Sequence, residues 1–177
     1  FDPEGRIVAA TRKVNLVPGL EDTLGLTPGR PADLLPVDAP FGRFGSLICY
    51  DGFHEPHTSK EPGFCRLVGH YDDLGCSVIA QPAANPWPWD ARWVFAEPGE
   101  TQLRRDQWQN EGLTAELSDA DLHAVRYGVT AHLLGDLFDN HFDGRSHILE
   151  RRGHEVVVLA EAASSHASLE SEEGVVH

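Results

Sequence analysis

Residues 42–52 read Gly42-Arg43-Phe44-Gly45-Ser46-Leu47-Ile48-Cys49-Tyr50-Asp51-Gly52. The near-continuous apolar run over 44–50 predicts a strand that is covered on both faces, as in a parallel sheet. Such a strand delivers Cys49 to its carboxyl end, which is where open α/β sheets bind ligands. Cys49 is therefore a candidate nucleophile, and the backbone N–H groups just after it could face a developing oxyanion. The alternative is a structural cysteine, because free cysteine is among the most buried residue types.

The segments on either side of this strand indicate a βαβ unit. Apolar residues recur at helical spacing over 64–74, and Gly75 stands where a helix C-cap glycine belongs. Residues 76–80 are typical of the next buried strand, so the two strands should be parallel neighbours. Upstream, residues 6–11 predict a short strand, and residues 15–40 predict a long loop rich in Pro and Gly.

The middle of the chain predicts an irregular stretch followed by helices. Three prolines within residues 82–90 each remove a backbone donor, so we expect no regular structure there. Residues 101–111 have a helix-forming composition. A second helix is expected to begin at Ser118, whose hydroxyl could cap it, with Asp121 completing a capping-box pattern.

The end of the chain predicts a hairpin and a tail. Residues 146–150 and 156–160 are typical of two strands that flank a tight turn. We therefore expect one α/β domain with a mixed sheet over residues 1–163. Residues 164–177 are rich in Ser, Glu and Ala and are expected to form a loosely ordered acidic tail.

Composition excludes several classes of function. Lys and Arg number 14 and Asp and Glu 28, so a net charge of −14 disfavours nucleic acid and anionic membranes as partners. No apolar run approaches the roughly 20 residues that span a bilayer, and no signal-peptide pattern opens the chain. Three cysteines without a CxxC pair do not suggest a disulfide framework, which favours a reducing, cytoplasmic location. The chain starts at Phe1 and contains no Met, so we expect a further segment upstream.

A second group of residues precedes the strand that carries Cys49. Thr11-Arg12-Lys13-Val14-Asn15-Leu16-Val17-Pro18 places a lysine before a long loop that carries Glu21. An isolated lysine is usually a solvated surface charge. The order RKVNLVP, Glu21 and GRFGSLICYDG, however, closely resembles the nitrilase (carbon–nitrogen hydrolase) superfamily. That family has a lysine in RK-x-x-L-x-P, a glutamate a few residues on and a cysteine in G-x-x-I-C-Y-D. The resemblance covers about residues 2–88 and continues weakly in FDGRS at 142–146.

The resemblance implies a site and a fold. Cys49 corresponds to the nucleophile, Lys13 to the triad lysine and Glu21 to a second glutamate that orients the site. The backbone N–H of Tyr50, with Lys13, would form the oxyanion hole. The implied fold is a four-layer αββα sandwich, of which this chain supplies the larger, later part. The implied substrate is a small-molecule amide or nitrile, with no cofactor, and a homo-oligomer is expected.

The chain departs from the family in two places. Gly52-Phe53-His54-Glu55-Pro56 is shorter by one residue than the family's continuation after the cysteine, and it is reordered. The family's general-base glutamate lies well upstream of the lysine. Glu4 is nine residues before Lys13, which along a strand is about 20–30 Å, too far for proton transfer. We therefore expect this base in an N-terminal half outside the chain. The alternative is a catalytically incomplete homologue that serves as a structural or ligand-binding subunit.

The strand beside the one ending near Cys49 leads into Asn85-Pro86-Trp87-Pro88-Trp89. Asn85 and Trp87 are candidate substrate-binding residues, although the indoles could equally close the core or a subunit contact. His54 and His57 are three apart, and Pro56 would break a zinc-binding helix, so we expect no metal. Arg104 and Arg105 are expected on a solvated helix face.

Overall fold

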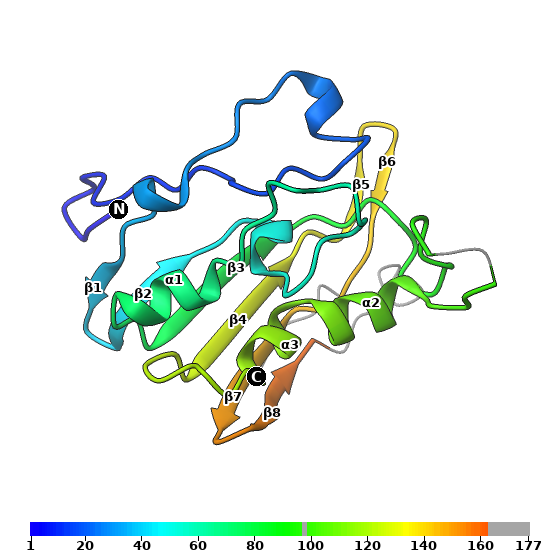
Figure 1. Cartoon of the computed structure of the whole chain (residues 1–177). Coiled ribbons are helices and arrows are strands. Elements are labelled where there is room, and N and C mark those ends of the chain that lie inside the picture. The colour runs from blue at the N-terminus through cyan, green and yellow to red at the C-terminus, as the bar shows by residue number, and fades with distance from the viewer. Residues whose placement is uncertain (97–98, 163–177) are drawn as a thin grey trace.

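The structure, a computed structural model, describes residues 1–96 and 99–162 and is built on a six-stranded mixed sheet (Figure 1). Its strands, in the spatial order β1-β2-β3-β4-β7-β8, are β1 (Val37–Ala39), β2 (Gly42–Ser46), β3 (Val78–Ala83), β4 (Tyr127–His132), β7 (His147–Arg152) and β8 (Glu155–Glu161). Strands β2, β3 and β4 are parallel, whereas β1, β7 and β8 run antiparallel to their neighbours. A separate hairpin consists of β5 (Gly135–Leu137) and β6 (Asn140–Phe142). The predicted α/β class with a mixed sheet is confirmed.

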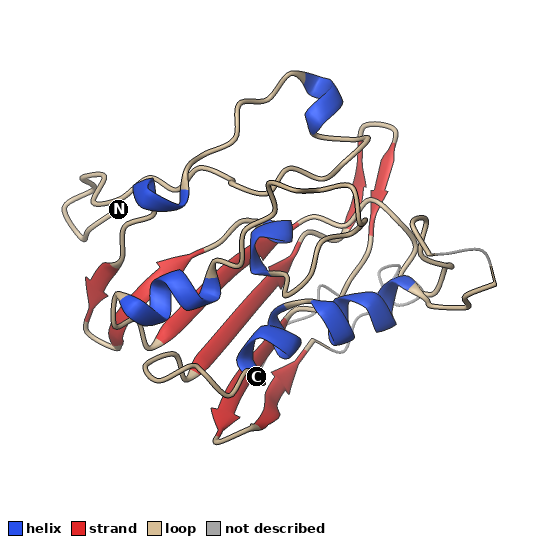
Figure 2. Cartoon of the chain, viewed as in Figure 1, coloured by secondary structure: helices blue, strands red, loops and turns tan. Residues whose placement is uncertain are grey.

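Three helices lie together on one face of this sheet (Figure 2). They are α1 (Val68–Asp73), α2 (Arg104–Glu111) and α3 (Leu113–Leu117), and three 3-10 turns, η1 (Asp22–Leu24), η2 (Pro31–Asp33) and η3 (Cys49–Gly52), lie in the connections. Packing is close enough to require glycine: a Cβ on Gly45 would lie 2.4 Å from the ring of Tyr71, and one on Gly128 would lie 2.8 Å from Leu113. In the described residues no helix has the length and apolar character needed to cross a membrane.

The opposite face of the sheet carries a second apolar surface. Because side chains alternate along a strand, Phe44, Val78, Val129 and Ile148 point away from the helices, and all four are half-buried. The described chain thus forms one helix layer and one sheet layer, two of the four layers of an αββα sandwich. The tail boundary expected at residue 163 stays a prediction, because residues 163–177 lie outside the described part of the chain.

Two predicted elements near the N-terminus differ from the structure. Residues 6–11 form no strand, and Ile7 and Val8 are 70% and 53% exposed, because no described segment pairs with their backbone. Within the loop 15–40 the chain forms η1, η2 and β1.

The helix expected over 64–74 is confirmed but begins only at Val68. Gly75 has a φ of +74°, the left-handed conformation of a C-terminal helix cap.

The prediction of irregular structure from residue 82 was wrong by two residues, because β3 continues to Ala83. Strand β2 ends at Ser46, opposite Ala80, so β3 has a single neighbour beyond that point. The backbone N–H and C=O groups of Ala80 point toward β2, since its carbonyl accepts the Leu47 N–H. Because backbone groups alternate along a strand, those of Pro82 point to the same side. The missing N–H of Pro82 therefore falls on an open edge, where proline is tolerated.

The helix expected to start at Ser118 was also wrong. Ser118 ends α3, and its hydroxyl donates to the carbonyl of Ala115. The chain that follows forms turns and bends instead of a helix, and the carboxylate of Asp72 accepts the N–H groups of residues 123, 124 and 125. The helix at 101–111 and the hairpin of β7 and β8 are confirmed to within a few residues.

Candidate active site

Cys49 lies directly beyond the carboxyl end of β2, as predicted. The strand ends at Ser46, Leu47 still donates to Ala80 of β3 at 2.9 Å, and η3 begins at Cys49. Cys49 has a φ of +53°, a left-handed conformation that costs a non-glycine residue about 1–3 kcal/mol. Such conformations are typical of nucleophiles that are presented at a sharp turn after a strand.

The sheet holds the backbone of Cys49 in this conformation. The side-chain amide of Gln81, on β3, donates to the Cys49 carbonyl at 2.7 Å. The hydroxyl of Thr130, on β4, donates at 2.7 Å to the Gln81 oxygen. Both side chains are buried, so the cysteine turn is fixed to two central strands by a fully satisfied polar chain.

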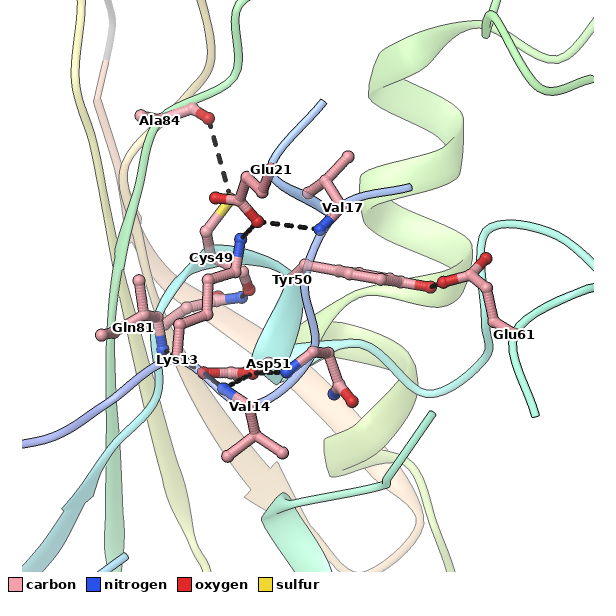
Figure 3. Close-up of polar contacts among 12 residues, drawn as sticks. Lys13, Val14, Val17, Glu21, Cys49, Tyr50, Asp51, Glu61, Gln81 and Ala84 are labelled. Carbon is pink, nitrogen blue, oxygen red and sulfur yellow. Dashed lines mark hydrogen bonds and ion pairs between the residues drawn. The ribbon is translucent and has the colours of Figure 1, made fainter. Parts of the chain in front are cut away.

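Asp51 joins the cysteine turn to the segment that carries Lys13 (Figure 3). Its fully buried carboxylate accepts the N–H groups of Val14 at 3.0 Å, Asn15 at 2.7 Å and Ile48 at 3.3 Å. Burial raises the pKa of Asp51 to about 6, against the lowering effect of these bonds and of Lys13. The sequence analysis gave Asp51 no role in the site. The signal available was a lone carboxylate directly after an apolar run.

Lys13 and Glu21 form an ion pair within the site. The Lys13 side chain is only 11% exposed, so it is not a solvated surface charge. The same Glu21 oxygen accepts the Val17 N–H at 2.8 Å, which fixes the carboxylate on its own loop. Figure 3 shows both charged groups directed to the region of the Cys49 sulfur, and the Cys49 thiol donates to the Ala84 carbonyl at 3.7 Å. The three residues predicted to share a site are brought together.

A cavity of about 240 Å³, named here the cysteine cavity, opens beside Cys49. Its lining includes Glu21, Cys49, Tyr50, Trp87, Arg104 and Phe142. Trp87 therefore lies where a substrate-binding residue was expected. A larger hollow of about 910 Å³ shares only His57 with the cysteine cavity and contains no cysteine, so we do not associate it with the chemistry.

Tyr50 is anchored on both sides. Its hydroxyl donates to Glu61 at 2.8 Å and accepts the His57 N–H at 2.6 Å, and its ring stacks on that of His57 at 3.8 Å. The backbone N–H of Tyr50 stands in the first turn of η3, where N–H groups have no acceptor within the turn. This N–H is available to an oxyanion beside Cys49. Burial and the nearby cations lower the pKa of His57 to about 2, so its ring is neutral.

Arg104 is a correction to the sequence analysis, because it is 3% exposed rather than solvated. Its Nε donates to Asn85 at 2.7 Å, and its guanidinium lies 3.9 Å from the centre of the Trp93 ring. Burial lowers the pKa of Arg104 to about 9, although Cys49 and Glu111 oppose this shift. The residue remains a cation at neutral pH.

Asn85 acts on Arg104 rather than lining the cysteine cavity. It is fully buried, and its amide nitrogen donates to the carbonyls of Trp87 at 2.7 Å and Asp143 at 3.0 Å. Its oxygen is the acceptor for Arg104. All its polar atoms are thus engaged within the protein. Over residues 1–96 and 99–162, no cluster of three or more His, Cys, Asp or Glu side chains is arranged to hold a metal ion.

Comparison with known proteins finds similarity to a hydrolase in sequence and to amidases and an NAD+ synthetase in structure. No protein-family model matches the sequence. Hydrolase C26A3.11 of Schizosaccharomyces pombe is 32% identical over 91 residues, which are 48% of this chain and 24% of the yeast protein.

Solved structures extend the match to nearly the whole chain. The NitN amidase of Nesterenkonia sp. AN1 aligns with a TM-score of 0.53 and 19% identity over 87% of this chain and 47% of its own. A mutant of the Nesterenkonia AN1 amidase, described as from the nitrilase superfamily, gives a TM-score of 0.55 at 19% identity, covering 89% and 47%. The glutamine-dependent NAD+ synthetase of Acinetobacter baumannii gives 0.58 at 18% identity, covering 98% and 26%. The chain spans less than half the length of each of these proteins. Its fold is that of the nitrilase superfamily, as the resemblance of its sequence predicts.

Proposed function

We propose that this chain carries the nucleophile of a hydrolase that cleaves non-peptide carbon–nitrogen bonds in small amides or nitriles. The observation that supports this most is the shared cavity. Cys49, in a strained turn at a strand end, faces the same space as Glu21, which is paired with Lys13. An ammonium beside a cysteine favours the thiolate, the reactive form, and stabilises negative charge that develops on the substrate.

The proposed reaction proceeds through a thioester. The Cys49 thiolate attacks the amide carbonyl carbon, and the charge that moves to oxygen is stabilised by the Tyr50 N–H and the Lys13 ammonium. The C–N bond then breaks, and the amine or ammonia leaves with a proton. Water attacks the thioester, releases the carboxylic acid and returns the thiol. Glu21 pairs with Lys13 and directs its ammonium group at the reacting atoms.

Proton transfer to the leaving nitrogen requires a second carboxylate. Within the described residues, Glu21 is the carboxylate that lines the cysteine cavity, and it is already engaged by Lys13 and Val17. We propose that the general base is a glutamate from an N-terminal half outside these 177 residues. On this proposal the chain alone binds substrate but turns it over poorly.

The relatives support amides as the substrate class. The Nesterenkonia neighbours are named amidases. One mutant structure (TM-score 0.51, 17% identity) is described as the result of Michael addition of acrylamide at the active-site cysteine, which is attack on the alkene and not on the amide. Nitriles remain the alternative substrate, since attack of the same thiolate on a nitrile carbon needs no other residues.

The second candidate is a catalytically incomplete homologue that acts as a structural or ligand-binding subunit. It is favoured by the same shortage of a second carboxylate in the cavity. The two candidates differ in one observable, which is acylation of Cys49.

Intact-mass spectrometry of the full-length protein with short aliphatic amides tests the proposal. We expect an acyl adduct and release of ammonia, both lost in Cys49→Ala. Cys65→Ala, at a half-buried cysteine outside the cavity, is the matched control and should retain both. Absence of adduct and of ammonia from the full-length protein would favour the non-catalytic subunit.

A further inference from the structure

The cysteine cavity contains a buried cation without a carboxylate partner. Arg104 lines it, and among the described residues no carboxylate forms an ion pair with its guanidinium. Its Nε donates to the Asn85 oxygen at 2.7 Å and its Nη1 to the Gln107 oxygen, so both acceptors are neutral amides. Cys49 and Glu111, the charged groups that act on Arg104, form no ion pair with it, and burying a cation without a directly bonded anion is costly, which makes the site receptive to one.

The Arg104 guanidinium is held in place through Nε, Nη1 and one face of its plane. A guanidinium only donates, so Gln107 must present its oxygen to Arg104. The Gln107 amide nitrogen then donates to Glu111 at 2.6 Å and lies 3.2 Å from Nδ1 of His57. Stacking on Trp93 holds the guanidinium plane. Neither hydrogen bond uses Nη2, which is left for a ligand.

We propose that Arg104 binds a carboxylate at the far end of the acyl chain of the amide that Cys49 attacks. The substrate class is thus the monoamide of a short dicarboxylic acid. This inference rests on the proposed function and narrows its substrate. A cavity of about 240 Å³ suits a molecule of this size, with the amide at Cys49 and the carboxylate at Arg104. A charge-assisted bond to a buried guanidinium is strong enough to select such substrates over neutral amides.

Protection of Cys49 from alkylation tests this without requiring turnover. The protein is treated with iodoacetamide at pH 7.5 in a Cys65→Ser background, and alkylation is followed by intact mass. Glutarate and its neutral diamide, which have the same chain length, are compared as protectants. We expect half-protection by glutarate at about a 10- to 100-fold lower concentration, the range for one hydrogen bond to a charged group. Equal protection by the two compounds overturns the proposal, and this comparison needs only the unmutated site.

Variants then assign the preference to Arg104. Arg104→Gln should remove the advantage of glutarate, whereas Arg105→Gln, at the exposed neighbour that pairs with Asp90, should keep it. If Arg104→Gln slows alkylation in the absence of ligand but preserves the preference for glutarate, Arg104 serves the thiolate and the proposal is wrong. Glutarate can protect Cys49 even if no amide acylates it, so failure of hydrolysis and failure of this inference are distinguishable.

Discussion

Asp51 connects the two sequence segments that make the site, and it is the residue on which their relative position depends most. Three backbone N–H groups from residues 14, 15 and 48 converge on its carboxylate. An amide in its place has one acceptor oxygen and would turn a donor toward one of those N–H groups. We expect Asp51→Asn to lower the free energy of unfolding at pH 7 by about 1–3 kcal/mol. Urea denaturation measures this, with the exposed Asp73→Asn as a control expected to change little.

The pH dependence of this effect follows from the raised pKa of Asp51. An unfolded aspartate titrates near 3.9, whereas burial raises the folded pKa to about 6, so the folded state binds the proton more tightly. The stability this group contributes is fully present below about pH 4 and is lost as the pH rises through about 6. Relative to Asp51→Asn, the native protein should therefore lose about 2–3 kcal/mol between pH 4 and pH 6.5. A relative gain over that range would mean that the hydrogen bonds outweigh burial.

Some site residues could be predicted from the sequence and others could not. Cys49, Lys13 and Glu21 could be proposed because their spacing lies within short segments. Arg104 could not, because its burial depends on Trp87 and Trp93 from a distant irregular segment, and a helix of polar composition indicates a solvated face. Asn85 was assigned to the right neighbourhood, but its hydrogen bonds to Arg104 and to residues 87 and 143 need tertiary structure.

At the scale of elements, the fit of α1 against the sheet rests on a position without a side chain. A Cβ on Gly45 would lie 2.4 Å from the ring of Tyr71, which is fully buried and cannot move aside. We expect Gly45→Ala to destabilise the fold by about 1–3 kcal/mol through overpacking. Thermal unfolding measures this, and Gly69→Ala provides the control within α1. Nothing lies within 4 Å of a Cβ there, so better helix propensity should raise stability by up to about 1 kcal/mol. Similar effects of both variants would contradict the packing argument.

The elements that were predicted correctly are those whose own apolar residues are enough to place them in the core. Residues 44–50 and 76–80 are apolar runs flanked by turns, and each became a central strand or its end. Residues 6–11 have the same local character but find no neighbour to pair with. The segment after Ser118 had a capping pattern, yet Asp72 from α1 accepts its N–H groups, and the segment forms turns and bends instead of a helix. Both errors arose from partners distant in sequence.

For the whole molecule, the decisive feature is the sheet face that carries no helix. Its parallel strands β2, β3 and β4 present Phe44, Val78 and Val129 on that side, and sheets with parallel strands are normally covered on both faces. Next to Phe44 and Pro82 a hollow of about 830 Å³ is bordered by Val8 and Phe41, and these two are more than half exposed. An apolar face of this extent marks a contact surface, which agrees with the second sheet layer of an αββα sandwich.

We therefore propose that the 177-residue chain, when the N-terminal half proposed above is absent, associates through this face, with a second copy in the place of that half. Sedimentation velocity should show concentration-dependent dimers, and Val129→Lys should shift the population to monomer by placing a charge in the contact. The same substitution at Val94, which is 53% exposed and lies elsewhere, should leave the dimer intact. Val129 is half-buried at the sheet surface. We therefore expect Val129→Lys to reduce the free energy of association more than it reduces the free energy of unfolding. A chain that stays monomeric at every concentration would contradict this assignment. The apolar face would then be stable in water without a partner.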